Sequence, residues 1–167
     1  MHLQQINLWT NAEAQAAFLR CCGAPRWAEQ LAACRPFLRE DDLVDAAERI
    51  WHALGRDDWL QAFAAHPRIG DVDALRTKFS STAACSTAEQ AGLAAAADSV
   101  LLSLAEGNRR YEKKFGYIFI VCAAGKTASE MLAMLQQRLT NDPEKELPIA
   151  AGEQARITRL RLQKLCS

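Results

Sequence analysis

One stretch of this sequence, FGYIFIVCA at residues 115–123, is aromatic and β-branched in the way that is typical of a β-strand. No second stretch has this composition, and one strand cannot form a sheet by itself. Elsewhere the apolar residues recur at helical spacing. The sequence therefore predicts an all-α fold, a single helical-bundle-like domain over residues 1–167. Residues 115–123 are then a buried extended apolar segment or part of a dimer contact.

Capping motifs and helix breakers predict where the helices begin. The capping-box motif Thr10-Asn11-Ala12-Glu13 predicts a helix that ends at about Cys22, before Gly23. A second capping box, Ser86-Thr87-Ala88-Glu89, predicts the start of the longest helix. The other helices are expected to start at Pro25, at Asp41 or Asp42, at Asp57 or Asp58, at Thr127, and at Pro143 or Pro148.

Glycine and proline predict where helices stop. The third helix is expected to end at Gly55. The fourth must end near Ala65, because Pro67 forces His66 out of the helical region. Gly107 is expected to kink or end the longest helix.

Charge and cysteine usage exclude several classes of function. The 167 residues include 20 Lys+Arg and 20 Asp+Glu, so the strongly basic surface of a nucleic-acid-binding protein is not expected. No apolar run reaches the ~18–20 residues that span a membrane, and residues 1–15 do not resemble a secretory signal, so we expect a cytoplasmic protein. Six cysteines without CxxC spacing and three histidines predict neither a metal site nor a disulfide framework.

His66 is the most suggestive histidine. It follows a predicted helix and precedes Pro67 in a loop with Gly70, so its ring can be held while one nitrogen stays free. The C-terminus of the helix favours the protonated imidazole. His66 is therefore either a cap that hydrogen-bonds the last carbonyls of the helix or a residue that carries chemistry.

Glu89 and Gln90 lie in the first turn of the longest predicted helix, and their spacing to Leu93 and later apolar residues places both toward its apolar face. A partly buried carboxylate has a raised pKa and can donate a proton. Ser86, three residues before Glu89, is expected on the same side. Glu89 is then either the capping-box partner of the Ser86 amide or a proton-transfer group.

Arg161 raises a similar question in the last helix. The predicted apolar stripe of that helix consists of Ile157, Leu160, Leu162 and Leu165. Helical geometry puts Arg161 near the middle of this stripe and Arg159 on the solvent side. A guanidinium on a buried face needs an anion, which is either an Asp or Glu of the core or a substrate carboxylate.

Five motifs together resemble one family. They are RPF (35–37), AHPRIGD (65–71), STAEQAGL (86–93), NRRYEKKFGYIFIVCAAGKTASEML (108–132) and ARITRLRL (155–162). In this order, over nearly the whole chain, they resemble the 2-oxo-4-hydroxy-4-carboxy-5-ureidoimidazoline (OHCU) decarboxylases. The most specific blocks are the HPxxG loop, the SxxEQ helix start and the NxRYExKFG[YF] block.

The resemblance implies an all-helical homodimer that converts OHCU to (S)-allantoin in the last step of urate degradation, with no metal or organic cofactor. His66 and Glu89 match the family's catalytic histidine and glutamate, with the division of proton transfer between them left open. The positions implied to bind substrate are Pro67, Ser86, Gln90, Phe119, Ile120 and Arg161, with Arg159 as the competitor of Arg161. The segment FGYIFIV would line the pocket with backbone amides and carbonyls.

Two other functions stay open at this point. A helical interaction module without chemistry would contain a buried Glu89–Arg161 or His66–Glu89 pair and no adjoining cavity. A hydrolase of a related cyclic ureide would need a positioned nucleophilic water and would form its product without releasing CO₂.

Overall fold

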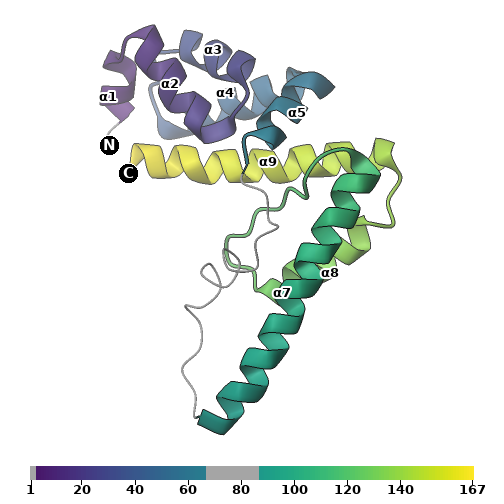
Figure 1. Ribbon diagram of the computed structural model, residues 1–167. Coiled ribbons are helices and arrows are strands. Elements are labelled where there is room, and N and C mark those ends of the chain that lie inside the picture. Colours follow the sequence, from purple (N-terminus) through teal and green to yellow (C-terminus); the bar gives the residue numbers. More distant parts are fainter. Residues whose placement is uncertain (1–2, 67–86) are drawn as a thin grey trace. The chain divides into compact units, whose positions relative to one another are not determined.

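The computed structural model describes residues 3–66 and 87–167, and the side chains of residues 3–66 and 98–167. Helices dominate these ranges and no strand occurs within them, so the predicted all-α fold is confirmed (Figure 1). The chain divides into two compact units. The first unit is Met1–His66 with Ala151–Ser167, and the second is Pro67–Ala150.

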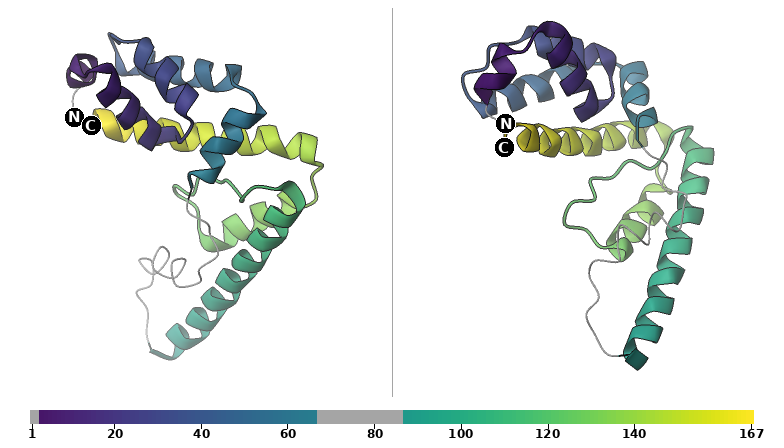
Figure 2. Two further views of the ribbon diagram at one scale, coloured as in Figure 1. Left: turned by 45° about the horizontal axis from the view of Figure 1, so that its top comes forward. Right: turned by 60° about the vertical axis from the view of Figure 1, so that its left-hand side comes forward.

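The first unit packs its N-terminal helices on the end of the chain. These helices are α1 (Leu3–Leu8), α2 (Asn11–Cys22), α3 (Pro25–Ala33), α4 (Glu40–Ala53) and α5 (Arg56–Ala64), and the last helix is α9 (Pro143–Cys166). The C-terminal part of α9 runs along them in all views (Figure 2). Two buried indoles fix this packing: Trp27 Nε1 donates to the Ala47 carbonyl and Trp51 Nε1 to the Ala151 carbonyl, each at 2.9 Å.

Local sequence signals explain α2 well. The Glu13 amide donates to Thr10 Oγ1, and Glu13 Oε2 accepts the Thr10 amide at 2.8 Å, which completes the predicted capping box. Gly23 ends the helix in the left-handed region, with φ 87°, and its amide donates to the Leu19 carbonyl at 2.8 Å. Both predicted boundaries of this helix are confirmed.

Other helix starts differ from the prediction. Helix α4 has Arg39 as its N-cap instead of Asp41 or Asp42, because Asp42 occupies the third helical position and accepts the Arg39 amide at 3.0 Å. Helix α5 begins at Arg56 after Gly55, one residue before Asp57. The six-residue helix α1 was not predicted at all.

In the second unit, α7 (Thr87–Phe115) and α8 (Ala128–Arg138) pack together with the first residues of α9. Helix α7 runs through Gly107, so of the two predicted outcomes, a kink or an end, the end is wrong. A Cβ on Gly107 would lie 2.6 Å from Leu135 Cδ2. The glycine therefore serves the close approach of α7 and α8 rather than a break.

The strand-like run is a buried segment without regular secondary structure. Phe115 is the last residue of α7, and residues 118–123 form neither helix nor strand. Tyr117, Phe119 and Ile120 are at most 8% exposed. The rings of Phe115, Tyr117 and Phe119 all lie against Tyr111, with centroid distances of 4.5–5.8 Å. The predicted buried apolar segment is confirmed.

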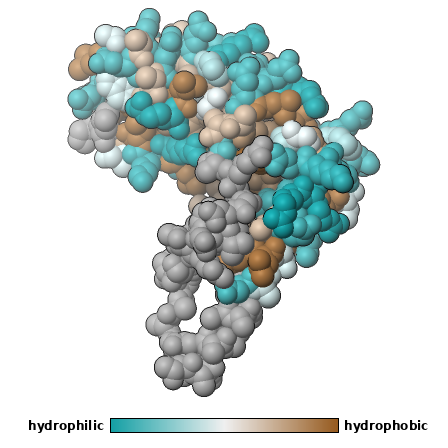
Figure 3. Space-filling view, in the orientation of Figure 1, coloured by the Kyte–Doolittle hydropathy of each residue, from teal (hydrophilic) through white to brown (hydrophobic). Residues whose placement is uncertain are grey.

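The surface carries few exposed large apolar side chains. Over α1–α5, polar residues cover most of the face shown in Figure 3, and Leu8 and Leu38 are the most exposed apolar side chains among the described residues. No helix in the described ranges is both long and apolar enough to cross a membrane. Those ranges also contain no group of three or more His, Cys, Asp or Glu that could hold a metal ion.

Candidate active site

His66 lies just beyond the end of α5, where α2 also ends. Its amide donates to the Phe63 carbonyl at 3.1 Å, which continues the last turn of α5 through Ala65. A Cβ on Gly23 would lie 2.5 Å from the Ala65 Cβ. The missing side chain at Gly23 therefore lets the two helix ends come close enough for the Cys22 carbonyl and His66 to share a partner.

That partner is Gln154 of α9, whose side chain is fully buried. His66 Nε2 lies 2.6 Å from Gln154 Oε1, and the Gln154 amide nitrogen donates to the Cys22 carbonyl at 3.4 Å and to Thr158 Oγ1 at 3.1 Å. The imidazole therefore binds a side chain of α9 and does not cap α5. This decides against the capping role that the sequence left open.

The surroundings of His66 favour the neutral form of its imidazole. Burial lowers its pKa from the usual 6.5, the bond to Gln154 opposes this, and the charge of Arg161 lowers the pKa further. The helix C-terminus by itself favours the protonated imidazole, as expected, but loss of solvent and the charge of Arg161 act in the opposite direction. A neutral imidazole has one donor and one acceptor nitrogen.

Arg161 belongs to the same cluster, since its charge acts on His66 and its Nη1 donates to the Cys21 carbonyl at 3.0 Å. Within the described part of the chain no carboxylate pairs with it. Arg159 faces away as expected and pairs with Glu48 at 3.1 Å. The predicted stripe is wrong at Leu160, which is 45% exposed, and at Arg161, which is exposed and not at the middle of a buried face. The buried face follows Gln154, Thr158 and Leu162 instead.

The two neighbouring cysteines are not activated. Burial raises the pKa of the Cys22 thiol to about 11, and it also raises the pKa of Cys21. Both thiols are therefore protonated near neutral pH and are poor nucleophiles. The imidazole and the guanidinium are therefore better candidates for chemistry than the thiols.

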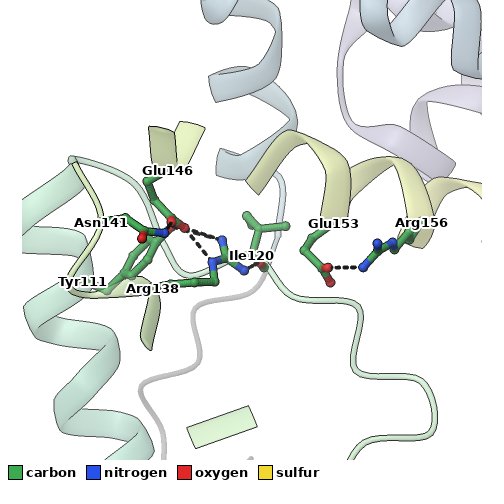
Figure 4. A network of polar contacts seen from close by, with 7 residues as sticks. All are labelled: Tyr111, Ile120, Arg138, Asn141, Glu146, Glu153 and Arg156. Atoms are coloured by element: carbon green, nitrogen blue, oxygen red, sulfur yellow. Dashed lines mark hydrogen bonds and ion pairs between the residues drawn. The ribbon is translucent and has the colours of Figure 1, made fainter. Parts of the chain in front are cut away.

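A second polar cluster lies within the other unit and holds the segment that contains Phe119 and Ile120 (Figure 4). Arg138 pairs with Glu146 at 2.6 Å and donates to the Ile120 carbonyl at 2.8 Å. Its guanidinium carbon also lies 4.6 Å from the centroid of the Phe119 ring. The Ile120 carbonyl is thus already bound by Arg138.

Glu146 completes that cluster. It is fully buried, accepts from Arg138 and from the Tyr111 hydroxyl through one oxygen, and accepts from Asn141 at 2.7 Å through the other. Burial and the bond to Glu146 raise the pKa of Tyr111, so its hydroxyl stays protonated and donates. Every charge in this cluster has a partner.

Several predicted site residues cannot be placed in these clusters. Glu89 and Gln90 lie in the first turn of α7, which begins next to Ser86 as expected, but their side chains lie outside the described residues. Pro67 and Ser86 also lie outside them. Of the predicted residues, His66 and Arg161 are brought together, and Phe119 and Ile120 lie side by side in the buried segment.

The sequence analysis did not single out Gln154, Thr158, Arg138 or Glu146. A buried glutamine has no motif of its own, and a signal exists only once the buried face of α9 is known: Gln154 and Thr158 are four residues apart on it. Glu146 looked like an ordinary acidic residue of a first helical turn.

Comparison with known proteins identifies the chain. The family model described as OHCU decarboxylase matches residues 7–163. The chain belongs to the OHCU decarboxylase family. The resemblance inferred from the five sequence motifs is therefore confirmed.

Members of this family appear among both the curated relatives and the solved structures. Uric acid degradation bifunctional protein TTL of Arabidopsis thaliana is 42% identical over 88% of this chain and 45% of its own length. The 2-oxo-4-hydroxy-4-carboxy-5-ureidoimidazoline decarboxylase of Amia calva is 28% identical over 78% of this chain and 74% of its own. The chain thus spans less than half of the Arabidopsis relative.

The crystal structure of an OHCU decarboxylase in the presence of (S)-allantoin has a TM-score of 0.72 to this chain. It is 39% identical and is matched over 89% of this chain and 96% of its own. The OHCU decarboxylase fold thus accounts for nearly the whole of that protein.

Proposed function

We propose that this chain decarboxylates OHCU to (S)-allantoin, the last step of urate degradation, without a metal or organic cofactor. The observation that carries the proposal is the cluster around His66. It combines a neutral imidazole with an arginine that has no carboxylate partner among the described residues. Such a cluster suits an anionic substrate that also exchanges a proton. Family membership supplies the identity of that substrate.

The substrate can act as its own electron sink. Its carboxylate is on a ring carbon next to a ring C=N bond. When the bond to CO₂ breaks, its electron pair forms a new C=C bond, and the π pair of the C=N bond moves to nitrogen, which takes up a proton. The enol then loses its hydroxyl proton while the carbon that carries the ureido group gains one. The face that receives this proton determines the configuration of allantoin.

Arg161 is proposed to bind the carboxylate. One of its five N–H donors is used by the Cys21 carbonyl, which leaves the others for an anion. Gln90 is proposed to bind the polar ring beside it. Holding the carboxylate out of the ring plane aligns the breaking bond with the C=N system.

His66 is proposed to meet the hydroxyl and carboxylate region, and Glu89 to exchange the proton of the ring, although these two roles could be reversed. The neutral state of His66 supports the first assignment, because an unprotonated nitrogen can accept the hydroxyl proton. Pro67, Ser86 and the segment with Phe119 and Ile120 are proposed to line the substrate. These assignments follow the family's motif.

Three further properties belong to the same proposal. Residues 1–167 act as one OHCU decarboxylase-like domain, the protein is a homodimer, and it works in the cytoplasm. The match of one family model to residues 7–163 supports the first of them, and the resemblance to the family is the ground for the other two.

The test generates OHCU in situ from urate with the two upstream enzymes and follows the circular dichroism of the allantoin formed. Uncatalysed decay of OHCU gives racemic allantoin, so it produces no net signal. We expect a rapid signal of the (S) enantiomer with release of CO₂. Racemic product at the uncatalysed rate would contradict the proposal and favour an interaction module. Product without CO₂ would favour a hydrolase.

A further inference from the structure

Gln154 is an uncharged side chain buried completely at the centre of the His66 cluster. Both ends of its amide are used: Oε1 faces His66 Nε2 at 2.6 Å, and the amide nitrogen faces the Cys22 carbonyl and Thr158 Oγ1. A buried amide is retained only where its donors and acceptors are matched. Its partners therefore decide which way it points.

The Cys22 carbonyl fixes that orientation. A backbone carbonyl only accepts hydrogen bonds, so the end of Gln154 that faces it must be the NH₂ group. Turning the amide over would place two oxygen atoms against each other at Cys22 and would present NH₂ to the ring. The carbonyl is itself held at the end of α2, where Gly23 closes the helix.

The orientation of the amide in turn fixes the imidazole. Because Oε1 of Gln154 can only accept, His66 Nε2 must carry a proton. In the neutral ring the other nitrogen, Nδ1, is then unprotonated. An amide differs here from a carboxylate, which would pair with the ring and favour the imidazolium form.

We propose that Gln154 is a positioning residue for the decarboxylation, which holds His66 as the Nε2–H tautomer and makes Nδ1 the nitrogen that meets the substrate. This inference rests on the proposed function. It adds to that function which atom of His66 acts, and it assigns a role to a residue outside the family motifs quoted above. The chain of contacts runs from the Cys22 carbonyl through Gln154 to the ring.

The tautomer can be measured directly in the full-length protein labelled with ¹⁵N-histidine. The sequence has three histidines, and a His66→Ala variant identifies the signals of His66 by their loss. At a pH where the ring is neutral, we expect the ¹⁵N shift of a protonated Nε2 and an unprotonated Nδ1. A proton on Nδ1 would overturn the proposal, whatever the catalytic activity of the protein.

Two variants test whether Gln154 determines the tautomer of His66. Gln154→Met removes the acceptor at similar length, so both tautomers should become populated and kcat should fall roughly tenfold or more, with KM changed less. Gln154→Glu keeps an acceptor but adds a charge, so it should raise the pKa of His66 and shift the pH profile of kcat upward. The matched control is Gln163→Met, which changes an exposed glutamine of the same helix. It should change neither the tautomer of His66 nor the pH profile of kcat.

The outcomes separate this inference from the proposed function. Unchanged tautomer populations in Gln154→Met, or an altered tautomer with unchanged kcat, would overturn the positioning role while the decarboxylase function stands. If Gln154→Met does not fold, the tautomer of the wild type and the pH profile of Gln154→Glu decide. If the wild type forms no (S)-allantoin, the proposed function fails, and a positioning role in that reaction fails with it.

Discussion

Arg138 and Arg161 are both guanidinium groups on long helices, but their surroundings differ. Arg138 is 5% exposed and donates to Glu146, to the Tyr111 hydroxyl and to the Ile120 carbonyl. Arg161 is exposed and donates to the Cys21 carbonyl, and no carboxylate lies beside it in the described ranges. The first group is neutralised inside the protein, whereas the second has no counter-charge among the described residues.

The titratable groups beside these arginines differ in the same way. The Tyr111 hydroxyl donates to Glu146 and accepts from Arg138, so both of its functions are used. His66 uses one ring nitrogen for Gln154, and in the proposed tautomer the other nitrogen is an acceptor. A cluster with all groups matched stabilises the fold, while a charge and a lone pair that have no partner among the described residues suit the proposed binding and proton transfer.

The largest effect is expected from His66→Ala. If the imidazole exchanges a proton in the reaction, kcat should fall by roughly 10²–10⁴-fold. The formation of (S)-allantoin, followed by circular dichroism, measures this. The control is His52→Ala, which changes an exposed histidine of α4 and should retain full turnover. Near-normal kcat in His66→Ala would mean that His66 takes no part in the reaction, so the two clusters would not differ in this respect.

The next effect concerns stability rather than turnover. Glu146→Leu leaves the Arg138 guanidinium buried without its counter-charge, and Arg138→Met does the reverse. Each change should lower the free energy of unfolding by about 3–5 kcal/mol, measured by urea denaturation. A loss below about 1 kcal/mol would mean that water replaces the missing partner.

A double variant and an exposed ion pair serve as controls for this cluster. Arg138→Met with Glu146→Leu removes both charges, so it should cost less than the sum of the single variants. Glu106→Gln breaks the exposed pair with Arg109 on α7 and should change the free energy of unfolding by less than about 1 kcal/mol. If the double variant lost as much free energy of unfolding as the two single variants together, Arg138 and Glu146 would not be a matched pair.

The parts of the fold that depend on local signals could be predicted from the sequence. The capping box at Thr10 and the stop at Gly23 depend only on neighbouring residues, and both were correct. Helix α1 could not be found in this way, because partners far along the chain hold it: Arg35 donates to the carbonyls of Ile6 and Trp9. The close contact at Gly107 could not be inferred in this way either, because its partner, Leu135, belongs to another helix.

The residues of the candidate site also differ in whether the sequence alone could predict them. His66 and Arg161 were found because they match the motifs of a family, whereas the buried position that helical spacing predicted for Arg161 is wrong, since Arg161 is exposed. Gln154 was missed, since a polar residue reveals its role only when burial and partners are known. The direction in which the pKa of His66 shifts could not be predicted either, because the helix dipole can be inferred from sequence but desolvation cannot.

A smaller effect is expected from Arg161→Gln. A hydrogen bond to a charged group contributes about 1.5–3 kcal/mol, so losing the contact with the substrate carboxylate should raise KM roughly ten- to hundredfold. Arg159→Gln is the matched control on the same helix, because Arg159 pairs with Glu48 at the surface. If Arg159→Gln raised KM and Arg161→Gln did not, the anion site would belong to Arg159.

The same variant changes the proton equilibrium of His66. Removal of a nearby positive charge should raise the pKa of the imidazole toward 6.5, which NMR titration of labelled histidine measures. In the wild type the folded pKa is lowered, so the unfolded chain binds more protons below about pH 6.5 and stability declines as the pH falls through the folded pKa. Arg161→Gln should therefore lose less stability between pH 8 and pH 5 than the wild type or Arg159→Gln. An equal loss in all three proteins would mean that burial alone, and not Arg161, keeps His66 neutral.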